Sequence, residues 1–182
     1  SGYVKSYKIF PTVINVYKRL NYDAVNKYFD KGEDENLNDV ASMLEILKDI
    51  CNLRKGIRKN RGSIDFDLPE IKVILNDKGR PVELQKRERN LAESIIEECM
   101  LVANETVAKH MYDKNRPFIY RVHGQPEDEK IDKFNELLAT FGLHINKQAG
   151  GKIKPIDIQH VLNKIQGKHE EKIISTIALR SM

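Results

Sequence analysis

Polar residues on the longest predicted helix have a spacing that could serve ligand binding. Asn90, Glu97 and Asn104 are seven residues apart, so an α-helix places all three on one stripe. Glu97 follows Ile95 and Ile96, a context that predicts a largely covered carboxylate. Such a carboxylate needs a donor, which an arginine, a tyrosine hydroxyl or a ligand hydroxyl can supply. These residues alone favour an internal hydrogen-bond network and leave a ligand contact open.

A second pattern interleaves basic and aromatic side chains. Tyr22, Phe66 and Tyr120 lie among basic segments of the sequence. Proteins hold single-stranded nucleic acid by stacking bases on aromatic rings and by placing cations beside the phosphates. Each ring taken alone is more often a core residue, and the net charge of +4 permits an anionic partner without requiring one. The cations that could follow phosphates are Arg54, Lys55, Arg58, Lys59, Arg61, Lys86, Arg87 and Arg89.

The sequence gives weak signals for a metal site. Asp65 and Asp67 share one face of a predicted strand close to Glu70, but a divalent cation needs several oxygen ligands converging on one point. A solvated or arginine-paired strand edge explains them better. The five histidines have no ligand spacing with each other or with Cys51 and Cys99, which argues against structural zinc. We expect both cysteines to be reduced thiols in a core.

The hydrophobic periodicity predicts an α+β fold with a long central helix, short antiparallel strands and a helical C-terminal part. The central helix spans about residues 87–110, roughly 36 Å at 1.5 Å per residue. Residues 2–16 predict an extended segment. The other expected elements are helices at 23–30, 37–59, 127–141, 155–165 and 170–179, strands at 64–66 and 118–122, and a hairpin of 70–75 with 81–85.

The length and composition suit one soluble globular domain. The chain has 182 residues, long enough to bury a core, and its 40% hydrophobic and 32% charged residues are ordinary for this class. No apolar stretch approaches the ~20 residues needed to cross a bilayer, and residues 1–10 contain no apolar signal-peptide core. We therefore expect no membrane segment.

Several sequence blocks resemble those of a known enzyme family. They occur in the same order as in that family and cover almost the whole chain. They are 19–25 (RLNYDAV), 61–70 (RGSIDFDLPE), 87–90 (RERN), 96–105 (IEECMLVANE), 120–123 (YRVH) and 179–182 (LRSM). The chain resembles the catalytic RNB domain of the ribonuclease II/ribonuclease R exoribonucleases. The Gly-x-Ile-Asp-Phe-Asp form at 62–67 is more similar to ribonuclease R.

The resemblance implies a cytoplasmic enzyme that hydrolyses RNA processively from the 3′ end to nucleoside 5′-monophosphates with Mg²⁺. It implies that Phe66 stacks against the terminal bases of single-stranded RNA. Tyr22 and Glu97 match residues that contact the sugar edge near the cleavage point, and a phenol and a carboxylate suit ribose hydroxyls. Candidate phosphate contacts are Arg61, Arg87 and Arg89.

Two parts of the family pattern have no counterpart in this sequence. The family's metal-binding aspartates precede the segment matched by residues 2–16, and a motif with a catalytic arginine follows the segment matched by 179–182. The resemblance therefore implies one incomplete domain over residues 1–182, with no catalytic residue, metal ligand or bound Mg²⁺ of its own. We expect this chain to bind RNA without cleaving it. Surface that the parent buries should be exposed and apolar, which could drive self-association.

Two alternatives from other classes remain open at the level of sequence. One is a non-catalytic RNA-binding or adaptor domain built on the same scaffold. The other is a helical interaction module whose aromatic residues all belong to the core.

Overall fold

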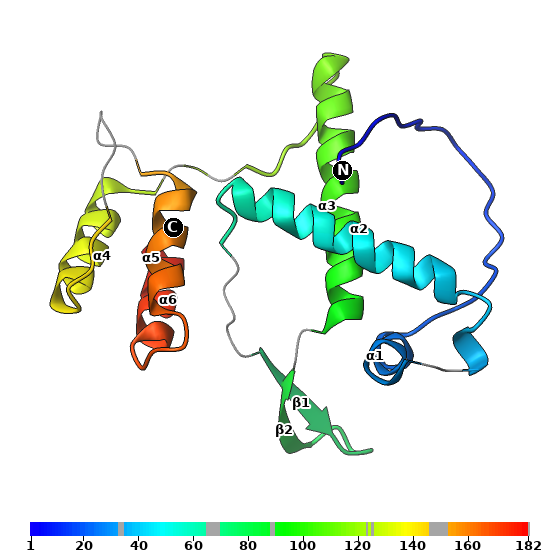
Figure 1. Cartoon of the computed structure of the whole chain (residues 1–182), viewed down its shortest axis with the longest axis horizontal. Coiled ribbons are helices and arrows are strands. Elements are labelled where there is room, and N and C mark those ends of the chain that lie inside the picture. Colours follow the sequence, from blue (N-terminus) through cyan, green and yellow to red (C-terminus); the bar gives the residue numbers. More distant parts are fainter. Residues whose placement is uncertain are drawn as a thin grey trace. The chain divides into compact units, whose positions relative to one another are not determined.

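A computed structural model describes residues 1–32, 35–64, 70–87, 90–122, 124, 126–145 and 153–181, apart from the side chains of Glu35, Glu70 and Arg87 (Figure 1). The chain forms two compact units. Unit 1 comprises residues 1–57 and 88–120, and unit 2 comprises residues 58–87 and 121–182. The α+β fold with a helical C-terminal part is confirmed.

Unit 1 is built on helices. They are α1 (Tyr22–Lys31), the short 3-10 helix η1 (Glu35–Leu37), α2 (Ala41–Asn60, which runs on into unit 2) and α3 (Leu91–Asp113). Helix α1 begins at Tyr22 because the Asn21 side chain caps it, accepting a hydrogen bond of 2.9 Å from the Ala24 N–H. The helix ends at Lys31 and is followed by the C-cap residue Gly32, whose positive φ of 90° suits a residue without a Cβ.

The core of unit 1 lies where α1 meets η1, α2 and the first turn of α3. Its buried members are Val25, Tyr28, Leu37, Val40, Leu44 and Ala92. One buried polar residue, Asn26 of α1, connects α1 to α3. Its Oδ1 accepts from the Ala92 N–H at 2.8 Å, and its Nδ2 donates to Glu93 Oε2 at 3.0 Å. Asn26 thus satisfies an N-terminal N–H of α3, whose own N-cap residue Asn90 makes no side-chain capping bond.

The predicted central helix is confirmed, but its position along the sequence is shifted. Helix α3 begins at Leu91 because Arg87 is still paired in a strand with Glu70, and it ends three residues later than expected, at Asp113. Its 23 residues give a length of about 34 Å.

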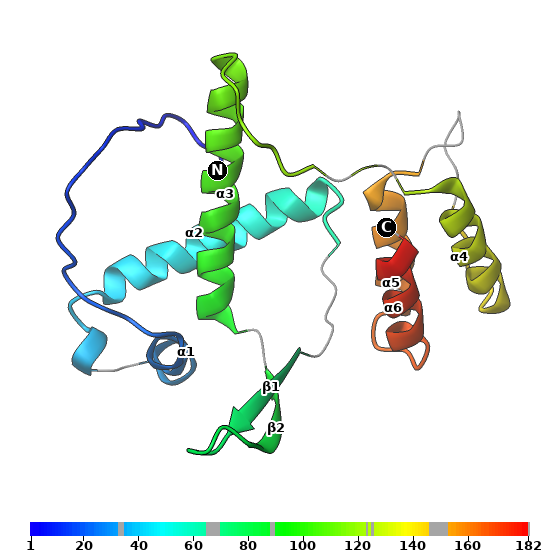
Figure 2. The ribbon, with the colours of Figure 1, turned by 180° about the vertical axis from the view of Figure 1, so that it is seen from behind.

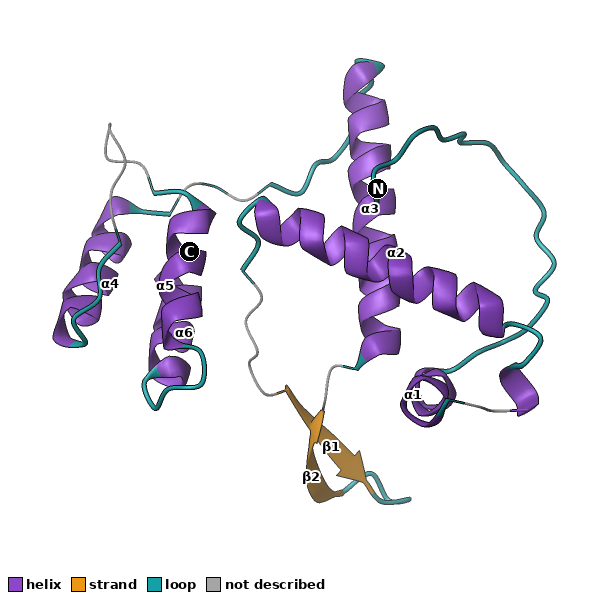
Figure 3. Cartoon of the chain, in the orientation of Figure 1, coloured by secondary structure: helices purple, strands orange, loops and turns teal. Residues whose placement is uncertain are grey.

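Unit 2 contains the hairpin of β1 (Glu70–Leu75) and β2 (Pro81–Arg87), the orange strands of Figure 3. The antiparallel register confirms the predicted hairpin and extends β2 by two residues. In the turn, Asn76 Oδ1 accepts from the N–H groups of Lys78 and Arg80, each at 3.0 Å. The predicted strand at 118–122 is wrong, since the structure shows no ladder there. Of the predicted strand 64–66, Ile64 is not in a strand, and the rest lies outside the described residues.

The C-terminal helices form a second core. Helices α4 (Asp128–Thr140), α5 (Pro155–Ile165) and α6 (Glu171–Ser181) lie side by side in both views (Figures 1 and 2). Their buried side chains are Ile131, Phe134, Leu138, Ile145, Ile153, Ile158, Val161, Ile165, Ile174 and Ala178. The three predicted C-terminal helices are confirmed.

Large apolar side chains are exposed in two parts of the described chain, while their burial in the parent protein and self-association stay predictions. One part is the extended segment 3–17, where Val13 is 99% and Tyr17 79% exposed. Within the described ranges this segment makes no backbone–backbone hydrogen bond. The other part is the hairpin, whose exposed apolar side chains are Ile71, Val73, Leu75, Val82 and Leu84.

Candidate nucleic-acid interface

Tyr22 is held at the surface as the first residue of α1. Its side chain is 44% exposed, so its ring is available to a ligand and does not belong to the core. The Asn21 cap fixes the backbone at this position, and Asn26 one turn later fixes α1 against α3. The structure therefore places the phenol on a rigid element, which is what a positioned ligand contact needs.

Glu97 is half-buried on α3, whereas Asn90 and Asn104 of the same stripe are exposed. The stripe therefore lies at the surface of the helix, and the carboxylate is less covered than its sequence context predicts. Glu97 is one turn beyond Glu93, which accepts a hydrogen bond from Asn26. Tyr22 is one turn before Asn26 on α1. The two predicted sugar contacts thus each lie one helical turn from the same interhelical hydrogen bond.

The sequence did not single out Glu98, the carboxylate next to Glu97. Glu98 is only 2% exposed and lies on the same buried face of α3 as Ile95. Burial raises the pKa of the Cys51 thiol of α2, Lys55 lowers it, and the charges of Glu98 and Glu97 raise it further. These carboxylates of α3 therefore lie near the middle of α2. A three-residue spacing from Ile95 was the signal for this burial.

The cysteines behave largely as predicted. Both are free thiols; Cys51 is buried in the core and Cys99 is half-buried. Because burial favours the neutral thiol, Cys51 has the character of a structural core residue.

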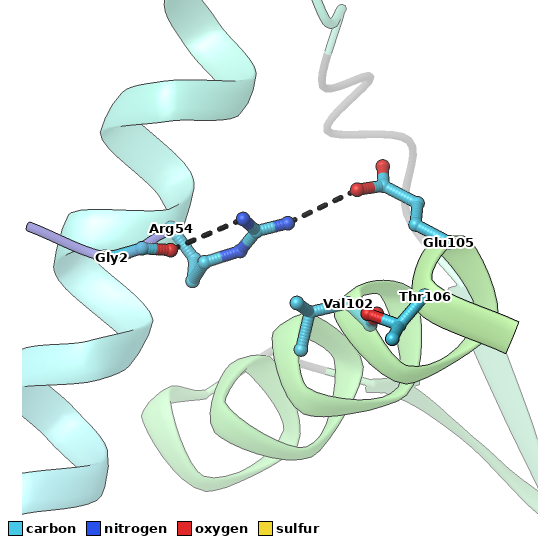
Figure 4. Close-up of polar contacts among 5 residues, drawn as sticks. All are labelled: Gly2, Arg54, Val102, Glu105 and Thr106. Carbon is cyan, nitrogen blue, oxygen red and sulfur yellow. Dashed lines mark hydrogen bonds and ion pairs between the residues drawn. The ribbon is translucent and has the colours of Figure 1, made fainter. Parts of the chain in front are cut away.

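The basic residues of α2 serve different roles, and the grouping of Arg54 with the cations that could follow phosphates is wrong. Arg54 is 7% exposed and donates to the Gly2 carbonyl and to Glu105 Oε2, each at 3.2 Å (Figure 4). It is therefore a structural cation of unit 1. Arg58 is half-buried and donates to Ser63 Oγ at 3.1 Å. Arg61 is exposed in the turn that ends α2, where a phosphate could reach it.

The turn that carries Arg61 is fixed to α5 within unit 2. Gln159 Nε2 donates to the Ser63 carbonyl at 2.7 Å and to the Lys59 carbonyl at 3.3 Å. Gly62 has φ of 89°, and a Cβ there would lie 2.7 Å from the Ile156 backbone nitrogen. The glycine is thus required by both conformation and space.

The other predicted contacts are described in part or not at all. Arg87 ends β2 opposite Glu70, but its side chain is not described, and Phe66 and Arg89 lie outside the described residues. The same holds for Asp65 and Asp67. Tyr120 is 40% exposed and packs edge-on against Phe118, with ring centroids 5.3 Å apart. In the described part of the chain, no three His, Cys, Asp or Glu side chains are grouped to hold a metal ion.

Comparison with known proteins assigns the fold to a family. Residues 1–182 match the RNB domain. The chain is 40% identical over 183 residues to Ribonuclease R 1 of Lactococcus lactis, an alignment that covers all of this chain and 22% of that protein. It is 30% identical over 184 residues to Ribonuclease R of Escherichia coli, again covering all of this chain and 22% of the relative. The chain belongs to the RNB domain family and spans less than a quarter of the length of these two relatives.

Solved structures share the same fold. Mycoplasma genitalium RNase R in complex with ribose-methylated single-stranded RNA superposes with a TM-score of 0.80 at 25% identity, covering 88% of this chain and 25% of that one. The complex of the same enzyme with double-stranded RNA gives a TM-score of 0.78 at 27% identity, covering 88% of this chain and 28% of that one. The predicted partial RNB fold is therefore confirmed. No helix in the described ranges has the length and apolar character needed to span a membrane.

Proposed function

We propose that this chain is an incomplete RNB catalytic domain from a 3′-to-5′ processive exoribonuclease that hydrolyses RNA to nucleoside 5′-monophosphates in the cytoplasm. Its own contribution is to contact single-stranded RNA near the 3′ end. The observation that carries the proposal is the placement of Tyr22 and Glu97. Tyr22 is exposed and Glu97 is half-buried, and each lies one helical turn from the Asn26–Glu93 hydrogen bond, in a chain of the RNB family.

The chemistry of these two side chains suits a ribose. A phenol can donate or accept a hydrogen bond and a carboxylate accepts, so both can pair with the 2′-hydroxyl that distinguishes RNA from DNA. In the proposal, Phe66 adds a stacking surface, while Arg61, Arg87 and Arg89 contact phosphates. Support from a related protein comes from Mycoplasma genitalium RNase R, which was solved in complex with ribose-methylated single-stranded RNA.

The proposal assigns cleavage to parts of the protein that have no counterpart in this chain. Hydrolysis of a phosphodiester by metal ions needs both a set of ligands for the ions and a group that stabilises the departing charge. In the intact enzyme the family's aspartates would hold Mg²⁺, and the ion would supply the metal-ion chemistry of hydrolysis. The present residues would bind the strand and orient its ribose.

Truncation of Tyr22 tests the RNA-binding role. We expect Tyr22→Ala to weaken binding of a fluorescein-labelled oligouridylate by about 2- to 12-fold, the equivalent of the roughly 0.5–1.5 kcal/mol that one hydrogen bond contributes. The measurement is fluorescence anisotropy at low salt. Tyr112→Ala is the matched control, because Tyr112 is 76% exposed on α3 and has no proposed ligand. Equal affinities for the Tyr22 and Tyr112 variants would contradict the assignment.

A further inference from the structure

The extended segment before α1 is basic and contains no acid. Residues 1–21 include Lys5, Lys8, Lys18 and Arg19, and the first carboxylate of the chain is Asp23. Four aromatic side chains in the same segment are between 46% and 79% exposed, namely Tyr3, Tyr7, Phe10 and Tyr17. Cations interleaved with exposed rings are the composition that binds single-stranded nucleic acid.

Two contacts fix the beginning of this segment along the second half of α3. The first is the Arg54 guanidinium, which connects the Gly2 carbonyl to Glu105 (Figure 4). Gly2 has φ of 70°, and a Cβ there would lie 3.0 Å from Ile57 Cδ1, so the position favours glycine. The second is the hydrogen bond of 3.1 Å between Tyr7 Oη and His110 Nδ1, with the two rings edge-on.

Between these two anchors lies a hollow of about 380 Å³. Its walls are Val4, Lys5, Ser6 and Tyr7 of the segment, and Thr106 and Lys109 of α3. Two of these six residues are lysines from separate elements, and none is an acid. The Thr106 hydroxyl is already used, since it donates to the Val102 carbonyl at 2.6 Å. The ammonium groups are therefore the charged groups that a ligand in the hollow would meet.

Lys109 has one competing partner. Its Nζ donates to both carboxylate oxygens of Asp113, at 2.9 and 3.1 Å. The two side chains are 74% and 49% exposed, and pairs of this kind contribute little to stability because water solvates both charges. Lys109 can therefore exchange the carboxylate for a phosphate at little cost, and Asp113 should oppose the binding of an anion.

We propose that this hollow is a phosphate-binding subsite for single-stranded RNA, with Lys5 and Lys109 as the cations that contact the phosphodiester backbone. The inference rests on the RNA-binding function proposed above and adds a subsite to it. The anchored backbone of residues 2–7 keeps Lys5 in the wall of the same hollow as Lys109, so the site is formed before the RNA arrives.

The salt dependence of RNA binding tests the subsite. Each phosphate contact with a single strand contributes about 0.7 to the slope of log affinity against log salt. The double variant Lys5→Gln/Lys109→Gln should lower that slope by about 1.4, which reduces the affinity ratio between about 50 and 200 mM salt by about sevenfold. Asp113→Asn should instead tighten RNA binding, because it removes the carboxylate that competes for Lys109. The probe is the labelled oligouridylate, titrated with the whole chain.

The control variant Lys130→Gln/Lys133→Gln makes the same change of charge on α4. Those lysines are also exposed and paired, with Glu127 and Glu129. A slope lowered equally by both double variants, or by neither, would overturn the subsite while leaving RNA binding in place. Absence of salt-dependent binding by the unsubstituted chain would contradict the proposed function itself. Urea midpoints of the variants check that folding is unchanged.

Discussion

Replacing Gly62 with alanine should destabilise unit 2 by about 2–6 kcal/mol. A backbone with φ of 89° costs a non-glycine residue roughly 1–3 kcal/mol, and forcing a methyl group into occupied space costs a similar amount. The space is occupied by the backbone nitrogen of Ile156, 2.7 Å from the Cβ position, and backbone atoms at the start of a helix cannot move aside as a side chain can. The measurement is urea unfolding followed by circular dichroism.

Gly56 provides a matched control with the opposite sign. It lies inside α2, and a Cβ there would meet nothing within 4 Å. Gly56→Ala should therefore stabilise the protein by about 0.5–1 kcal/mol, because alanine loses less conformational entropy in a helix. If both substitutions changed the stability in the same direction and to the same extent, the claim that Gly62 packs closely on α5 would be contradicted.

The Asn26→Ala variant should lose about 1–3 kcal/mol of stability. The substitution removes the acceptor for the buried Ala92 N–H and the donor to Glu93, and an unsatisfied buried donor costs about this amount. Because Tyr22 and Glu97 each lie one turn from this contact, RNA binding should weaken as well. The stability change is measured by urea unfolding. The affinity is measured by fluorescence anisotropy in buffer without urea, at a temperature well below the thermal unfolding midpoint.

Asn52→Ala is the control for this prediction. Asn52 is exposed on α2, so its replacement should leave RNA binding unchanged and should alter stability by no more than about 0.7 kcal/mol, the difference in helix propensity. An Asn26→Ala protein with unchanged stability would show that the bond between α1 and α3 contributes nothing. Unchanged RNA affinity in a destabilised Asn26→Ala protein would show that the bond between α1 and α3 does not position Tyr22 and Glu97 for RNA.

Local patterns in the sequence predicted most of the helices and the hairpin, because these elements depend on neighbouring residues. The helical periodicity of α2 and α3 and the turn residues Asn76 and Gly79 are signals of this kind. The start of α3 was predicted four residues early, since strand pairing of Arg87 with Glu70 depends on a residue 17 positions away. The strand predicted at 118–122 failed for a related reason. Ile119 is 94% exposed, and β-branched residues form a strand only where a partner pairs with them.

The candidate site was predictable in its residue types but not in its supports. Glu97 was singled out by its spacing on the helix and Tyr22 by its place among basic segments, and the family resemblance gave both a sugar contact. The structure shows Tyr22 exposed and Glu97 half-buried. Asn26 carried no signal in the sequence, because its role depends on Ala92 and Glu93, more than sixty positions away. Arg54 was grouped with the cations that could follow phosphates. Its burial depends on Gly2 and Glu105, which are distant in the sequence, so the local pattern could not reveal it.

The most direct test of the central claim combines binding and cleavage in one sample. The isolated chain is incubated with 5′-labelled single-stranded RNA and Mg²⁺; binding is followed by anisotropy, and the length of the RNA by denaturing gel electrophoresis. The account predicts salt-dependent binding with RNA of unchanged length. Shortening of the RNA with release of nucleoside monophosphates, abolished by a metal chelator, would contradict the claim that cleavage depends on parts of the protein outside this chain.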